Sequence, residues 1–197
     1  MRRELYANYN RSNSPVLAKP GQQKETGVMN MTGNREVITG SDFKRMVSGA
    51  YSEFLLEYEE INALKGAGHM PGTHILRTMG AAVMPLSDTK DDSIGGLARR
   101  IATAAVFGAR GSAGVVLAQM FRGLGKGLSG KYNATSSEFG KAFQYGILYA
   151  QRVLPDVPER PIITVAKAVA KGAYHAVRAN VPITEILAAA IDAGEDA

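Results

Sequence analysis

Apolar residues recur at intervals of three and four positions through most of the chain from residue 37 onward, and this spacing restricts the fold more than any other feature. The longest series starts at Phe43, ends at Leu64 and keeps the i, i+3, i+4, i+7 pattern over about six turns of helix. Similar series surround Ile94 and Val169. No segment alternates between apolar and polar residues for long enough to form a strand. The pattern therefore predicts an all-α protein of about seven helices.

Capping residues and prolines set the expected ends of these helices. The sequence predicts that Ser41 caps the helix ending near Leu64, and that the next helix starts near Thr73 and stops at Pro85. The expected landmarks of the later helices are Ser93 as an N-cap, a break over residues 108–114, a capping box of Thr135 and Glu138, Pro161 at a first helical position, and Thr184 as the last N-cap.

Residues 1–36 differ from the rest, because they are rich in Asn, Ser, Gly, Lys and Gln and lack any periodicity. We expect them to form a disordered tail and residues 37–197 to form one helical domain. The tail holds six Lys and Arg against three Glu, so it carries three of the five net positive charges. A nucleic-acid interface would need a basic stripe on a folded face, and the sequence of the nearly neutral domain indicates none.

Composition excludes several classes of site. Hydrophobic residues make up 45% of the chain and charged residues 21%, which is typical of a globular protein in water. The chain has no Cys, so disulfides, thiol catalysis and cysteine metal sites are excluded, and we expect a reducing, cytoplasmic location. No apolar run reaches the roughly 18 residues of a membrane span.

Three blocks of the domain resemble the dihydroxyacetone-kinase and fatty-acid-kinase group. Residues 38–64 resemble the first helix of fatty-acid-kinase A-type proteins, residues 108–119 resemble their Gly-Ala-Arg-Gly-Asn-Ser-Gly block, and residues 162–165 resemble a later block. Order and spacing match from about residue 37 to the C-terminus. The domain is similar to DhaL, the nucleotide-binding subunit of bacterial dihydroxyacetone kinase. The resemblance implies a DhaL-like barrel of antiparallel helices, in a chain truncated at its C-terminus relative to full-length relatives.

The resemblance also implies a site at one rim of the barrel. Family members bind ATP or ADP there with Mg²⁺, and transfer the γ-phosphate to dihydroxyacetone or a fatty acid carried by a partner protein. The positions that match the nucleotide-binding residues are Gly111, Ser112, Ala113, Gly114 and Thr73. Independently of the resemblance, a helix beginning near Gly114 would offer backbone N–H groups to a phosphate. A plain helix–helix turn that needs glycine for packing is the alternative reading of residues 108–114.

The loop that should hold Mg²⁺ departs from the family pattern. Anchored on Gly72 and Thr73, the two family aspartates align with Gly68 and Met70, and neither residue offers the side-chain oxygen that Mg²⁺ prefers. His69 and His74 lack the i, i+4 spacing of a helical metal pair. We therefore expect no metal site and leave the catalytic residues unassigned.

Further departures affect the nucleotide site itself. Ser112 and Ala113 replace the family's Asn-Ser, and Arg160 and Pro161 replace its Gly-Thr. Two functions stay open: an impaired kinase domain that acts on a partner-carried substrate, and a non-catalytic relative that binds a nucleotide or a partner. The sequence also allows a homodimer, whereas a nucleic-acid partner is not expected.

Overall fold

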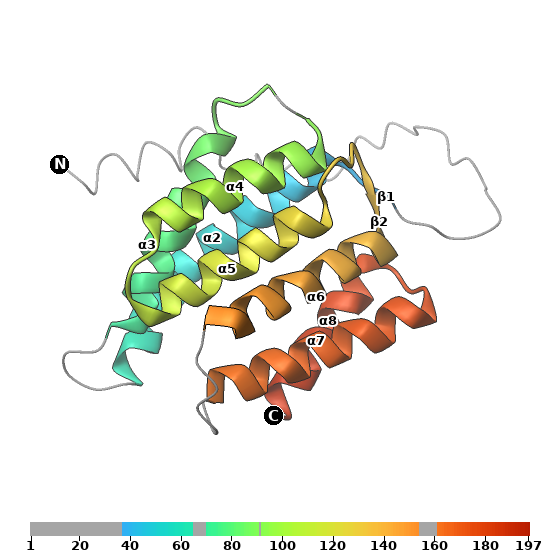
Figure 1. Cartoon of the computed structure of the whole chain (residues 1–197). Coiled ribbons are helices and arrows are strands. Elements are labelled where there is room, and N and C mark those ends of the chain that lie inside the picture. The colour runs from blue at the N-terminus through green and yellow to red at the C-terminus, as the bar shows by residue number, and fades with distance from the viewer. Residues whose placement is uncertain (1–36, 65–69, 91, 154–160) are drawn as a thin grey trace, which may run out of the picture. The chain divides into compact units, whose positions relative to one another are not determined.

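The computed structural model describes residues 37–64, 70–90, 92–153 and 161–197, and within these ranges it is helical (Figure 1). This confirms the predicted all-α fold, whereas the expected disorder of residues 1–36 concerns a segment outside the described residues. The seven α-helices described are α2 (Gly40–Ala63), α3 (Pro71–Val83), α4 (Ile94–Gly108), α5 (Gly111–Gly127), α6 (Ser136–Val153), α7 (Pro161–Ala179) and α8 (Ile183–Glu195). A 3-10 turn, η1 (Met84–Leu86), and two short strands, β1 (Val37–Ile38) and β2 (Ala134–Thr135), complete the described elements.

Small residues let successive helices pack closely and antiparallel. Gly95 of α4 lies against Leu128 and Gly125 of α5 against Ala98, so these two helices run in opposite directions. Between α5 and α6, Gly123 packs on the backbone of Tyr145, where a Cβ atom would overlap the Tyr145 carbonyl oxygen. Glycine is therefore required for this approach of the two backbones.

The two strands join the starts of α2 and α6. Val37 pairs with Thr135 and Ile38 with Ala134 in an antiparallel ladder. Each strand leads into a capping box, and the Phe that follows each box contributes to the core. The rings of Phe43 and Phe139 meet edge to face with centroids 5.9 Å apart, a favourable arrangement for two aromatic side chains.

The core follows the apolar faces of the helices. Ile94, Leu97 and Ile101 of α4 are buried, as their spacing predicts. The largest fully buried side chains are Phe43, Leu86, Ile94, Leu97, Ile101, Leu128, Ile147, Ile186 and Thr78. Within the described ranges, no helix is long and apolar enough to cross a membrane.

Three of the expected helix boundaries are wrong. Thr39 rather than Ser41 caps α2, because its hydroxyl accepts the Asp42 N–H at 3.2 Å while the Asp42 carboxylate accepts the Thr39 N–H at 2.9 Å. At α8 the N-cap is Pro182, and Thr184 lies inside the first turn without capping it. The break over residues 108–114 is also shorter than expected, because α5 already begins at Gly111.

Helix α3 begins and ends two residues before its expected start near Thr73 and its expected end at Pro85. The caps of α4 and α6 and the start of α7 agree with their predicted signals. The Ser93 hydroxyl accepts the Gly96 N–H at 3.2 Å and caps α4. The Glu138 carboxylate accepts the Thr135 N–H at 2.9 Å, while the Thr135 hydroxyl accepts the Glu138 N–H at 3.2 Å. Pro161 is the first residue of α7, where its missing N–H is not needed.

Candidate functional site

Helices α3 and α5 run parallel and begin at the same end of the helical domain. Gly111 of α5 packs against the His74 ring of α3, and one turn further Gly114 packs against the Thr78 hydroxyl. Both contacts advance in the same direction along the two helices, which fixes their parallel orientation. Since α6 is antiparallel to α5, it ends toward this side, where α7 also begins (Figure 1).

Only glycine fits at position 111 in this arrangement. Its φ of +60° lies in the left-handed region, which costs most L-residues about 1–2 kcal/mol. A Cβ atom at this position would also overlap the His74 imidazole. The tight turn between α4 and α5 therefore brings the first residue of α5 into direct contact with α3.

The first N–H groups of α5 lack a side-chain cap. Arg110 occupies the N-cap position, but its guanidinium turns back and donates to the carbonyl oxygens of Phe107 at 3.3 Å and Ala109 at 2.7 Å. The Gly114 N–H donates to the Arg110 carbonyl at 3.2 Å. The N–H groups of Gly111, Ser112 and Ala113 precede the first intrahelical bond, so they carry the partial positive charge of the helix end.

Thr73 lies in the first turn of α3 and is held by a residue of α2. The Asn62 amide donates to the Thr73 hydroxyl oxygen at 2.9 Å, and the Asn62 carbonyl oxygen accepts the Thr73 N–H at 3.2 Å. Asn62 thus takes the place of an N-cap for α3, whose own N-cap, Met70, makes no side-chain hydrogen bond. As an acceptor from Asn62, the Thr73 hydroxyl keeps its own proton for another acceptor.

The residues proposed from the sequence therefore lie on two neighbouring helix ends. Gly111, Ser112, Ala113 and Gly114 form the first turn of α5, and Thr73 lies in the first turn of the parallel helix α3. Ser112 is exposed and Gly114 is buried. Two parallel helices that begin side by side present two positive dipole ends, which suits an anionic group such as a phosphate.

Two residues of this end had not been assigned a role there by the sequence. His74 does not have the spacing from His69 of a helical metal pair, and in the structure its ring packs against Gly111. The sequence places Asn62 in the first helix, and the structure shows that it also holds Thr73. Neither contact has a local sequence signal, because both depend on how separate helices pack.

The described residues do not fit Mg²⁺ at this end. Gly68 lies outside the described residues, and Met70 offers an exposed thioether where Mg²⁺ prefers oxygen. In the part of the chain that the structure describes, no three His, Asp or Glu side chains gather as a metal site. Asp88 and Asp92 lie before α4, at the opposite end of the α4–α5 pair.

Comparison with known proteins finds similarity over most of the helical part of the chain. The model of the DAK2 domain family matches residues 71–197. Protein YloV of Bacillus subtilis is 31% identical over 124 residues, which is 63% of this chain and 22% of YloV. An uncharacterised protein of Staphylococcus epidermidis is 29% identical over 125 residues, or 64% of this chain and 23% of that protein. The chain thus spans less than a quarter of the length of these relatives.

Proposed function

This chain belongs to the DAK2 domain family, and from that premise we propose that its helical domain binds the phosphates of ATP or ADP at the shared N-terminal end of α3 and α5. Backbone N–H groups of Gly111, Ser112 and Ala113 hold the phosphate oxygens, and the Thr73 hydroxyl donates from the neighbouring helix. Gly114 lets α5 approach Thr78 closely. The observation that carries the proposal is the parallel pair of helix ends with an N-terminal turn that no side chain caps.

The family relation supports a kinase-related role for the domain. We propose that it derives from an ATP-dependent phosphotransferase that acts on dihydroxyacetone or a fatty acid held by a partner protein. Catalysis is impaired in this chain, because Gly68 and Met70 stand where the family has its metal-binding aspartates. A non-catalytic nucleotide- or partner-binding domain is the second candidate, favoured by the same substitutions.

Ser112→Glu tests the proposed site without weakening the helix. A carboxylate in the first turn of α5 stabilises the helix dipole, yet it repels a phosphate from the same N–H groups. Ser129→Glu adds the same charge beyond the opposite end of α5 and is the matched control. Titration calorimetry with ADP should give affinity lost at least tenfold in Ser112→Glu and nearly unchanged in Ser129→Glu, roughly the effect of one opposed charge at close range.

The effect of Mg²⁺ on ADP affinity tests the impaired metal loop, which both candidate functions assume. We expect the ADP affinity to be similar with and without Mg²⁺, because backbone donors persist while the carboxylates are replaced. Equal loss in both Ser→Glu variants would contradict the proposed location. A large gain in affinity with Mg²⁺ would contradict the impaired metal loop.

A further inference from the structure

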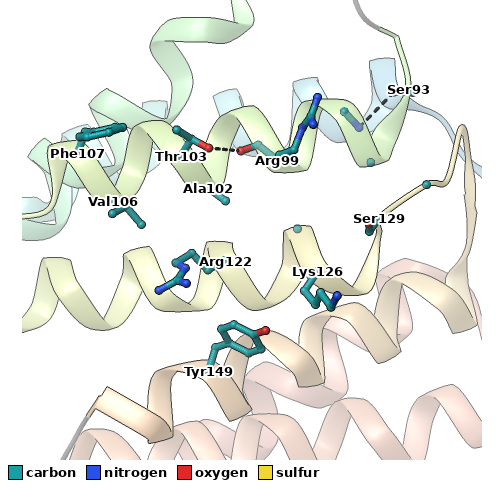
Figure 2. Close-up of a pocket in the computed structure, with 14 residues that line it drawn as sticks. Ser93, Arg99, Ala102, Thr103, Val106, Phe107, Arg122, Lys126, Ser129 and Tyr149 are labelled. Carbon is teal, nitrogen blue, oxygen red and sulfur yellow. Dashed lines mark hydrogen bonds between the residues drawn. The ribbon is translucent and has the colours of Figure 1, made fainter.

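A groove on the outer face of α4, α5 and α6 extends from the turn between α4 and α5 toward the opposite end of these two helices. It has a volume of about 910 Å³ and runs between α4 and α5, with Tyr149 of α6 at its border (Figure 2). Phe107 and Val106 line one end, and Ser93 and Ser129 line the other. We call this surface the α4–α5 groove.

The α4–α5 groove is basic. Arg99 of α4 and Arg122 and Lys126 of α5 line it, and neither helix contains an Asp or Glu. Figure 2 shows Arg122 and Lys126 on α5, between α4 and Tyr149. The Arg152 guanidinium lies 5.1 Å from the centroid of the Tyr149 ring and extends the positive surface. No local sequence pattern indicates this cluster, because its members come from three helices.

Side chains rather than the α4 helix end supply this positive charge. The Ile94 N–H donates to the Tyr132 carbonyl at 2.8 Å and the Gly95 N–H to the Lys131 carbonyl at 3.0 Å. The Gly96 N–H donates to the Ser93 hydroxyl. With these donors occupied, the groove suits carboxylates spread along its length better than a single phosphate.

An acidic and apolar surface with matching features lies on α2. Its members are spaced so that they share one face of the helix and all are exposed; they are Glu53, Leu56, Glu57, Glu60 and Leu64. Leu56 is 73% exposed and Leu64 is 83% exposed, so this helix face also presents two apolar side chains to solvent. We call this face the acidic stripe.

The acidic stripe is unfavourable for α2 on its own. Residues 52–63 hold four Glu and no Lys or Arg, and the last turn of α2 contains no basic residue. Like charges four residues apart repel each other, and carboxylates near a helix C-terminus oppose its dipole. A cationic surface placed against the stripe would remove both penalties.

We propose that the acidic stripe of one copy of this chain docks into the α4–α5 groove of a second copy. The glutamates face Arg99, Arg122 and Lys126, and Leu64 at the end of the stripe contacts the apolar end of the groove at Val106 and Phe107. The stripe extends about 16 Å and the α4 border of the groove about 21 Å, at 1.5 Å per helical residue. Because the contact joins two different surfaces, it assembles copies head to tail.

Charge reversal on each surface tests the contact. Sedimentation velocity of the full chain over a concentration series should show self-association that weakens as salt rises, since exposed charges are screened. Arg122→Glu with Lys126→Glu should weaken self-association by about tenfold or more, and so should Glu57→Lys with Glu60→Lys. Lys167→Glu with Lys171→Glu on the exposed surface of α7 carries the same change in charge as the groove variant and should leave self-association unaltered.

Mixing the two reversed variants separates docking from misfolding. The groove of one variant is then acidic and the stripe of the other is basic. The mixture therefore regains complementary surfaces, and the two variants should associate with each other. A wild-type chain that stays monomeric throughout the series would overturn the proposal. So would loss of association in the groove variant alone, because the occupant of the groove would then be something other than the stripe. Neither result depends on nucleotide binding.

Discussion

Gly111 connects the two halves of the proposed site, and its replacement has a predictable cost. Gly111→Ala should lower the free energy of unfolding through the positive φ and through overlap with His74. Gly130 is the matched control, because its φ is +76° and a Cβ atom there would meet nothing within 4 Å. Urea denaturation should give a loss of about 1 kcal/mol for Gly130→Ala and at least twice that for Gly111→Ala.

A second variant isolates the steric part of that cost. Removing the ring in Gly111→Ala with His74→Ala should restore part of the stability lost by Gly111→Ala alone, because the added methyl group then has room. Strictly additive losses in this double-mutant cycle would show that the two residues do not press on each other. Equal losses in the two Gly→Ala variants would mean that backbone strain alone requires the glycine.

At the scale of single elements, the capping box of α6 makes the stability of the fold depend on pH. The hydrogen bond from Lys131 at 2.7 Å, followed by that from the Thr135 N–H, lowers the pKa of Glu138 from 4.5 to about 2. A carboxyl group with a lowered pKa stabilises the fold above pH 4.5, and this contribution is lost as the pH falls toward about 2. Since the Glu138 side chain is 40% exposed, solvent screening reduces its worth to roughly 1 kcal/mol.

Glu138→Gln should therefore be less stable than the wild type at neutral pH and equal to it near pH 2. The glutamine keeps an acceptor for the Thr135 N–H but loses the charge that attracts Lys131. Glu185→Gln in the first turn of α8 is the control, because the Glu185 side chain is exposed. Thermal melts over a pH series measure the difference, and a gap between Glu138→Gln and wild type that persists at low pH would contradict the assignment.

Which segments form helices could be predicted from the sequence, because the spacing of apolar residues is a local signal. The fully inward series of Ile94, Leu97 and Ile101 is confirmed, and the Ser93 cap is correct. The sequence predicts Ser41 as the N-cap of α2 because its hydroxyl also suits that position. Only Asp42, which completes a capping box with Thr39, distinguishes the two residues.

Exposure and helix pairing were harder to predict. Leu64 continues the apolar period of α2 but is 83% exposed, whereas Asn62, two residues earlier, contacts α3. The parallel pairing of α3 and α5, which brings Thr73 to the same end as Ser112, depends on contacts between distant residues such as His74 and Gly111. Nothing in the local sequence indicates that these two helices pair.

At the scale of the whole molecule, the substituted metal loop predicts that catalysis is lost before binding. Phosphoryl transfer depends on metal ions that neutralise charge on the phosphate oxygens. Without the family aspartates the rate should fall roughly a thousandfold or more. ATP turnover with dihydroxyacetone or a carrier-bound fatty acid should therefore stay at background.

Replacing residues 65–71 with the family's loop should restore metal binding first and activity only in part. Ordinary kinase turnover by the unmodified chain would contradict this expectation.

The central claim is that nucleotide phosphates bind where α3 and α5 begin together, and backbone amide NMR tests it most directly. Titration with ADP should shift the amide signals of Thr73, Gly111, Ser112 and Ala113 with a single affinity, and adding Mg²⁺ should leave that affinity nearly unchanged. Ser112→Glu should abolish these shifts while the signals of α7 and α8 stay in place, which shows that the fold is intact. Shifts that instead cluster around Arg122 and Tyr149, or that appear only with Mg²⁺, would contradict the account.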